Sequence, residues 1–120
     1  MALLPTPMRY CLALDLKKDP LLIAQYEQHH SAIWPEIAQS ITEAGIVEMQ
    51  IYRIENRLFM IMETTSGFSF DKKGQMDAQN PKVQAWEALM WHYQQALPTA
   101  KAGEKWQLMT QIFELKKNSK

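Results

Sequence analysis

The sequence is poor in the features that mark several classes of protein. It has a single cysteine, Cys11, so no disulfide forms within the chain, and the place of this thiol in an apolar run indicates a reducing compartment. Thirteen basic and thirteen acidic side chains cancel, which leaves no net field to attract nucleic acid or an anionic membrane. The four glycines are scattered, and none opens a phosphate-binding loop after a strand.

Long apolar runs are absent as well. No stretch of about twenty apolar residues occurs, and residues 1–8 lack the basic start and apolar core of a secretory signal. We therefore expect a cytoplasmic protein without nucleic-acid or membrane partners. Within its 120 residues, we expect a flexible N-terminal segment (1–7), one domain (8–115) and a charged tail (116–120).

Metal ligands and catalytic nucleophiles are also poorly represented. His29, His30, His92 and Cys11 do not have the spacing of zinc ligands, and adjacent histidines on a helix point about 100° apart. No sharp strand-to-helix turn presents a serine nucleophile. We expect neither a metal nor another cofactor.

The patterns that are present alternate between strand and helix. Residues 8–16 alternate in hydropathy, as in a strand with one buried face. Asp19 and Pro20 are a typical N-cap and first helical residue. The helix that follows should be interrupted near Pro35 and end before Gly45, because proline disrupts a helix interior and glycine takes the left-handed conformation of a helix end.

A hairpin is predicted next. Residues 46–54 and 58–64 are typical of two strands, with Asn56 in the turn because asparagine tolerates positive φ. The second strand is apolar on both sides, which predicts a central position with both faces covered. The polar stretch that follows has room for a short helix after Ser69.

The last third of the chain repeats helix and strand. Asn80 and Pro81 open a second long helix that we expect to reach about Leu97, and residues 105–115 alternate as a last strand. The order of elements predicts an α+β fold of the ferredoxin-like βαββαβ type, with a four-stranded antiparallel sheet and helices on one face. The open face would expose apolar side chains, so we expect a homodimer that packs sheet to sheet as a dimeric αβ barrel.

A tyrosine and a histidine precede the proline break. Tyr26 and His30 stand four residues apart, so on a helix they share one face. Histidine suits proton transfer because its unperturbed pKa is about 6.5. Both residues also continue a helical apolar stripe, so packing in the core explains them as well. Trp86 is open to the same two explanations, whereas Trp34 is expected to pack beside Pro35.

The run Tyr26-x-x-x-His30-x-x-Ile33-Trp34-Pro35-Glu36, followed by Gly45, Ile51-Tyr52 and Leu58-Phe59, resembles the L-rhamnose mutarotase family over most of the chain. The resemblance implies a dimeric ferredoxin-like fold and cofactor-independent interconversion of the α and β anomers of a 6-deoxy-hexose. It further implies that His30 is a proton donor and that Tyr26 and Trp86 contact the sugar.

Two positions depart from the rhamnose pattern. Glu87 stands where the resemblance implies a second tryptophan, and Met49 stands where it implies a tyrosine. We include both among the expected substrate-binding residues. They are similar to a subgroup associated with L-fucose, so the sugar is L-rhamnose or L-fucose. Ring opening needs two proton transfers; we assign one to His30 and the other to Tyr26, Glu87 or a bound water.

Two other functions are compatible with the same fold. A non-catalytic dimeric module would bind a small ligand without changing the rate of anomer exchange. A monooxygenase-like protein would consume oxygen with an aromatic substrate and ignore sugars. The Tyr/His/Ile-Trp-Pro-Glu run favours the mutarotase.

Overall fold

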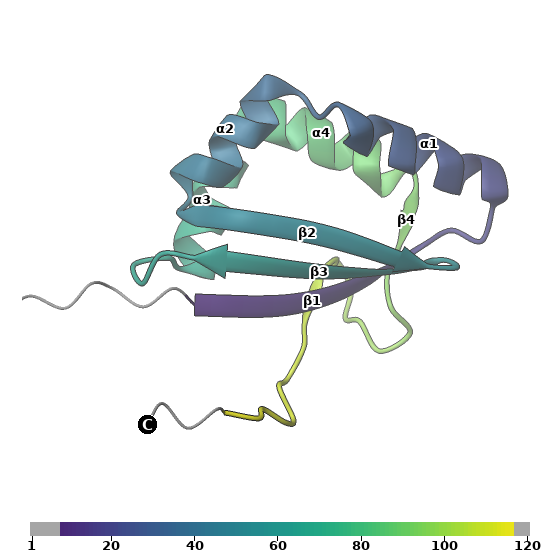
Figure 1. Ribbon diagram of the computed structural model, residues 1–120. Helices are drawn as coiled ribbons and strands as arrows, with labels where there is room; N and C mark the ends of the chain where they lie inside the picture. Colours follow the sequence, from purple (N-terminus) through teal and green to yellow (C-terminus); the bar gives the residue numbers. More distant parts are fainter. Residues whose placement is uncertain (1–7, 117–120) are drawn as a thin grey trace, which may run out of the picture.

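The computed structural model describes residues 8–116 as an antiparallel sheet covered by helices on one face (Figure 1). The expected flexible segment 1–7 and residues 117–120 of the expected tail lie outside this range. None of the helices in the described range has the length and hydropathy needed to cross a membrane. The elements in chain order are β1 (Met8–Leu16), α1 (Pro20–Ser31), α2 (Pro35–Glu43), β2 (Ile46–Ile54), β3 (Arg57–Thr64), α3 (Phe70–Ala78), α4 (Pro81–Trp91), β4 (Gln94–Gln95) and β5 (Gln107–Leu108).

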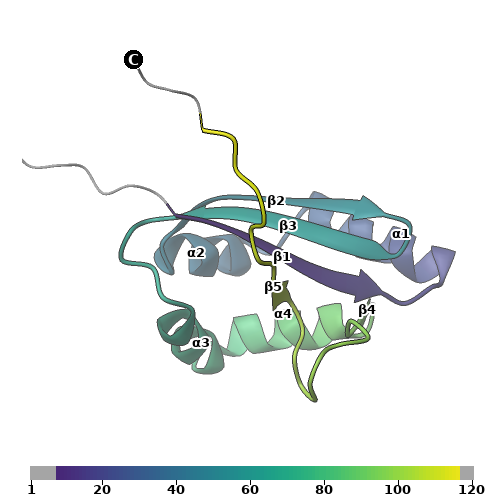
Figure 2. The ribbon, with the colours of Figure 1, turned by 90° about the horizontal axis from the view of Figure 1, so that it is seen from below.

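The strand order confirms the predicted α+β fold. The strands lie in the order β2-β3-β1-β4, all neighbours are antiparallel, and β5 also pairs with β1. This order has β3 between β2 and β1, so the prediction of a central position for the most apolar strand is confirmed. Helices α1, α2 and α4 lie over the same face of the sheet (Figures 1 and 2).

Side-chain caps fix the starts of three helices. Asp19 accepts hydrogen bonds from the backbone N–H groups of Leu21 (2.9 Å) and Leu22 (3.3 Å) at the start of α1. Asn80 caps α4 and Ser69 caps α3 in the same way. These bonds satisfy amides that have no partner within the helix. The predicted starts are therefore confirmed.

The proline break divides the first helical region into two helices. Trp34 is extended, with φ −62° and ψ 139°, because the ring of a following proline disfavours the helical conformation. Pro35 then occupies the first position of α2, where its missing N–H costs nothing. Trp34 packs on Trp86, with ring centroids 5.1 Å apart. The expectation that Trp34 packs beside the break is confirmed.

Two predicted boundaries in the last third of the chain are wrong. Helix α4 ends at Trp91 and does not reach Leu97, because residues 94–95 pair with β1. The last strand is Gln107–Leu108 and not residues 105–115. One more bond follows it, from the Met109 N–H to the Cys11 carbonyl (2.7 Å). The fourth position in the sheet is thus shared by two short strands on one edge of β1.

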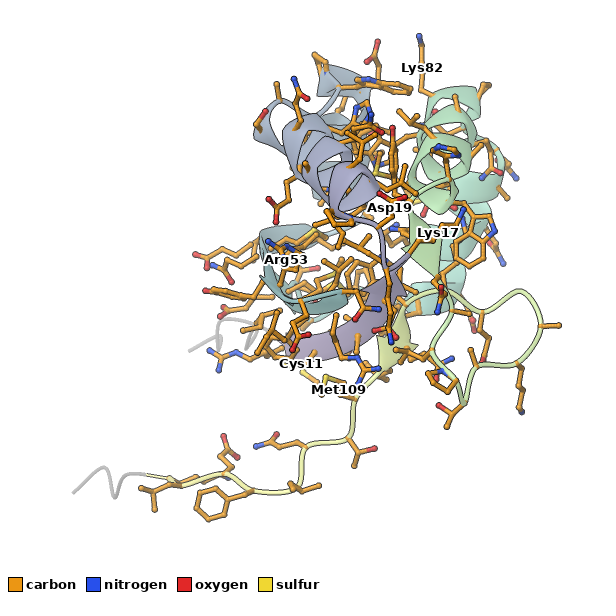
Figure 3. All side chains as sticks on the ribbon, turned by 90° about the vertical axis from the view of Figure 1, so that its right-hand side faces the viewer. Cys11, Lys17, Asp19, Arg53, Lys82 and Met109 are labelled. Atoms are coloured by element: carbon orange, nitrogen blue, oxygen red, sulfur yellow. The ribbon has the colours of Figure 1, made fainter. Side chains whose placement is uncertain are left out.

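The reason for both errors is that strand pairing depends on tertiary contacts. The predicted strand extends to residue 115, but after Met109 the segment leaves the sheet on the side away from the helices (Figures 1 and 3). Its apolar side chains Ile112, Phe113 and Leu115 are 94%, 76% and 81% exposed. Alternation shows that one side of a segment is apolar and does not show what it pairs with.

The turn of the hairpin also differs from the prediction. Glu55, not Asn56, has the positive φ, at 50°. The side chain of Asn56 instead donates a hydrogen bond to the carbonyl oxygen of Leu16 (3.0 Å). The asparagine is thus used to join the turn to the end of β1.

The two faces of the sheet differ in burial. On the helix side, Leu58, Met60 and Met62 of β3 are buried at 8% exposure or less. On the other side Phe59 and Ile61 are only partly buried, and Tyr52 and Ile54 of β2 are 57% and 72% exposed. The predicted cover on the second face is therefore not supplied by residues 8–116 of one chain.

Substitution of Gly45 tests whether the end of α2 requires a glycine. It ends α2 with φ 99°, and a Cβ added there would lie 3.0 Å from the Thr65 hydroxyl oxygen. We expect Gly45→Ala to lower the free energy of unfolding by about 1–2 kcal/mol, because the left-handed conformation is strained for an L side chain. Urea denaturation measures this change.

Gly74→Ala is the matched control. Gly74 lies inside α3, does not have a positive φ, and has no heavy atom within 4 Å of the place that an added methyl group would take. Alanine should stabilise this helix by about 0.5–1 kcal/mol. Equal effects of the two substitutions would contradict the conformational argument.

Candidate active site

A cavity of about 350 Å³ lies between the sheet and the helices. Most of its lining is aliphatic or aromatic, contributed by β1, α2, β2, β3 and α4. The five residues singled out in the sequence all line it: Tyr26, His30, Met49, Trp86 and Glu87. Residues far apart in the sequence therefore meet at one place.

His30 lies in the last turn of α1 with a fixed orientation of its ring. Its Nδ1 is 2.9 Å from the carbonyl oxygen of Tyr26. A carbonyl oxygen only accepts hydrogen bonds, so Nδ1 carries the proton and donates it. In the neutral ring the lone pair is then on Nε2, the atom that can take a proton from a ligand.

Burial lowers the pKa of His30 below its ordinary value. Desolvation disfavours the imidazolium cation, the hydrogen bond to the Tyr26 carbonyl opposes this effect, and the neighbouring His29 adds to the lowering. The net direction is downward from 6.5. At neutral pH the ring is therefore predominantly a neutral base.

The ring of Tyr26 packs against that of His30 at an angle of 38°, and the tyrosine remains protonated. The two ring centroids are 4.3 Å apart, and the tyrosine is 3% exposed. Burial raises the pKa of Tyr26 to about 12. Its hydroxyl oxygen accepts a hydrogen bond from Nε2 of Gln94 (3.4 Å), which leaves the hydroxyl hydrogen for another acceptor.

Trp86 forms a wall of the cavity and part of the core. It is 8% exposed and belongs to the main hydrophobic cluster. Its ring packs edge-on against His30, with centroids 5.6 Å apart. Packing in the core and contact with the cavity are thus combined in one side chain, as they are for Tyr26.

The two adjacent histidines have different surroundings. The Nε2 atom of His29 is 3.1 Å from the hydroxyl of Tyr93, and His29 does not line the cavity. Of the two, only His30 reaches it. This is the separation expected of neighbouring positions on a helix.

Glu87 and Met49 contribute different chemistry. Oε1 of Glu87 lies 3.6 Å from Nζ of Lys105, so an ion pair stands in the lining of the cavity. Met49 is on β2 and joins Met60 and Met62 of β3 in the apolar surface of the sheet beneath the cavity.

Sequence reasoning missed several residues of the cavity. Gln94 was assigned to a helix that in fact ends at Trp91, and a single glutamine has no periodic signal that would reveal its role. Lys105 and Trp106 were assigned to a strand, and they instead line the cavity from the loop before β5. Within residues 8–116, no three or more His, Cys, Asp or Glu side chains are grouped so that they could hold a metal ion.

Comparison with known proteins gives the family. A model of the L-rhamnose mutarotase family matches residues 9–115. The chain belongs to this family. It is therefore a mutarotase of 6-deoxy sugars, an isomerase that acts on carbohydrates. The resemblance seen in the Tyr/His/Ile-Trp-Pro-Glu run is confirmed.

Two relatives within this mutarotase family carry different sugars in their names. The chain is 47% identical over 109 residues to the L-fucose mutarotase of Xanthomonas campestris pv. campestris, covering 89% of this chain and 87% of that protein. It is 29% identical over 91 residues to the L-rhamnose mutarotase of Acidiphilium cryptum, covering 74% of this chain and 88% of that protein.

Solved structures support the fold. The crystal structure of an L-rhamnose mutarotase from Formosa agariphila superposes with a TM-score of 0.67 at 20% identity, over 91% of this chain and 99% of that one. A cofactor-independent oxygenase from Streptomyces nogalater superposes with a TM-score of 0.54 at 12% identity, over 92% and 98%. Both likenesses concern the fold alone, and the family match assigns the mutarotase activity.

The state of His30 can be measured by NMR. We expect its ring to titrate with a pKa below 6.5, because burial favours the neutral form, and to carry its proton on Nδ1. Nitrogen chemical shifts of labelled imidazoles report both properties, and His30→Asn identifies the signal. A ring that titrates at 6.5 or above, or that is protonated on Nε2 when neutral, would contradict this assignment.

Proposed function

We propose that the protein interconverts the α and β anomers of L-fucose in preference to L-rhamnose, with His30 as the group that takes the proton of the anomeric hydroxyl. The observation that supports the chemistry most directly is the hydrogen bond from His30 Nδ1 to the Tyr26 carbonyl, which leaves Nε2 as a base. The choice of sugar is supported by the 47% identity to an L-fucose mutarotase.

Opening of a cyclic hemiacetal requires two coordinated proton transfers. One proton leaves the anomeric hydroxyl, so that C1 becomes an aldehyde, and one proton reaches the ring oxygen as its bond to C1 breaks. His30 takes the first proton at Nε2, so in this proposal it becomes the proton donor implied by the resemblance only when the ring closes. After rotation about the C1–C2 bond, closure reverses both transfers and gives the other anomer. Acid–base assistance of this kind typically contributes about a hundred- to ten-thousand-fold.

Tyr26 is the proposed donor to the ring oxygen. Its pKa of about 12 keeps it protonated, and the alkoxide formed by ring opening is a stronger base than the phenolate. Gln94 donates to the phenol oxygen and would stabilise the charge that develops there. When the ring closes, Tyr26 recovers its proton from the sugar and His30 returns its own, so no proton is gained or lost.

The lining of the cavity suits a deoxy sugar. Met49, Met60 and Met62 present an apolar surface, on which the C6 methyl group can be buried without an unsatisfied hydroxyl. Trp86 offers an aromatic wall next to His30, a common surface for the C–H groups of a pyranose. In this proposal Tyr26, Met49, Trp86 and Glu87 bind the substrate.

A homodimer is the proposed assembly. The sheet face away from the helices carries Tyr52 and Phe59, with ring centroids 6.5 Å apart. The segment after β5 leaves the sheet on this side (Figure 1), and its exposed residues Ile112 and Phe113 line a surface hollow together with Phe59. A second copy placed against this face would remove these side chains from water and complete a dimeric αβ barrel.

Exchange between anomers tests the reaction. Saturation of one anomeric proton should transfer to the other faster in the presence of the protein, and more so for L-fucose than for L-rhamnose. His30→Ala should slow this turnover roughly a hundred- to ten-thousand-fold with a much smaller effect on sugar binding, and kcat/KM should fall as His30 becomes protonated in acid.

His29→Ala is the control for this experiment, since His29 contacts Tyr93 and not the cavity. It should keep most of the activity. Unchanged turnover in His30→Ala would overturn the proposed role. Faster exchange of L-rhamnose than of L-fucose would overturn the proposed sugar preference.

Sedimentation equilibrium tests the dimer. Ile112→Glu and Phe113→Glu together should shift the protein towards monomer, because they place two charges in the proposed interface. Leu21→Glu is the control, as Leu21 is 65% exposed on α1, on the helix side of the sheet. A wild-type monomer, or a dimer indifferent to the paired substitution, would argue against this interface.

A further inference from the structure

The ammonium group of Lys105 lies at one edge of the cavity and has a neighbour on each of two sides. Nζ of Lys105 lies 3.6 Å from Oε1 of Glu87 and 5.2 Å from the centroid of the Trp91 ring. Glu87 and Trp91 are four residues apart on α4, so they stand on the same side of that helix. The carboxylate and the indole face together define where the ammonium group sits.

Lys105 adds a cationic hydrogen-bond donor to the cavity, beside the groups that are assigned to proton transfer. Most of the lining is apolar, the Ser40 hydroxyl donates to the Ile37 carbonyl (2.8 Å), and the Gln94 amide donates to Tyr26. Lys73, the other lysine of the lining, pairs with Asp77. An ammonium group has three N–H donors, and among residues 8–116 Glu87 is the acceptor that faces that of Lys105.

Stability does not account for this arrangement. The side chains of Lys105 and Glu87 are 32% and 42% exposed, and an ion pair so accessible to water contributes at most about 1 kcal/mol. The pair nevertheless lies where the loop before β5 meets the cavity, beside Trp106, which packs on both hydrophobic clusters. The position of the ion pair is therefore fixed by packing, and its two charged groups remain accessible to a ligand.

We infer that Lys105, positioned by Glu87 and Trp91, binds a ring hydroxyl of the sugar and determines which 6-deoxy-hexose is preferred. Nζ donates to one hydroxyl, and the carboxylate of Glu87 accepts from the neighbouring one. L-Fucose and L-rhamnose share the C6 methyl group and differ in configuration at C2 and C4. A donor and an acceptor fixed at one edge of the cavity therefore distinguish them. The inference rests on the proposed function, because it assigns a role within the same cavity.

The experiment compares KM and kcat of anomer exchange for both sugars. Lys105→Met keeps the length of the side chain and removes the donors; it should raise KM for L-fucose roughly ten- to hundredfold, as expected for loss of a charge-assisted hydrogen bond, with kcat changed severalfold at most. KM for L-rhamnose should rise less, so that the preference shrinks. Lys105→Arg should restore part of the affinity.

Two further variants separate binding from structure. Trp91 does not line the cavity, yet Trp91→Leu should raise KM for L-fucose severalfold, because it removes the surface that holds the ammonium group. Lys101→Met is the matched control: Lys101 belongs to the same loop, does not line the cavity, and should leave both sugars unaffected. Thermal midpoints of all variants should lie close to that of the wild type.

The outcomes distinguish this inference from the proposed function. Exchange that depends on His30 but has the same KM in Lys105→Met and wild type would overturn the role of Lys105 and leave the reaction standing. An equal loss of kcat/KM for both sugars, with a lower thermal midpoint, would show that Lys105 only fastens the loop. If the wild type catalyses no exchange, the proposed function fails, and saturation-transfer NMR of sugar binding decides whether Lys105→Met weakens it; no binding overturns both.

Discussion

The break between α1 and α2 is the constraint on which the site depends. Pro35 cannot lie inside a helix, so α1 ends at Ser31 and α2 begins afresh. This end places His30 in the last turn of α1, with its ring beside Trp86 and over an apolar cavity. Burial there lowers the pKa of the imidazole. The helix break thus determines where the neutral imidazole of His30 lies, with its Nε2 atom available as a base.

The parts of the fold that were predictable from the sequence are those specified by local interactions. Asp19 and Asn80 bond amides two and three residues away, and Gly45 adopts a backbone conformation that few other residues tolerate. The end of α4 and the length of the last strand were not predictable, because both are decided by pairing with β1. No pattern within either segment specifies that partner.

The residues of the site divide in the same way, into those that local spacing reveals and those that only the tertiary structure brings to the cavity. Tyr26 and His30 were recognisable because helical spacing alone puts them on one face, and the run around them identifies the family. Gln94, Lys105 and Trp106 were not, since they reach the cavity through β4 and the loop before β5. The sequence left open whether Tyr26 and Trp86 pack in the core or face a ligand site. In the structure both side chains belong to the hydrophobic core and also line the cavity.

The two short strands on one edge of β1 have a consequence for how this protein changes over evolutionary time. β4 and β5 pair with the same strand, β1, at the two ends of the segment between them, while β2, β3 and the end of α1 that carries His30 belong to other parts of the chain (Figure 2). Substitutions in this segment can therefore alter one side of the cavity without disturbing His30 and Tyr26, the residues proposed to transfer protons. Selection can retune the ligand preference of such a protein and keep its chemistry.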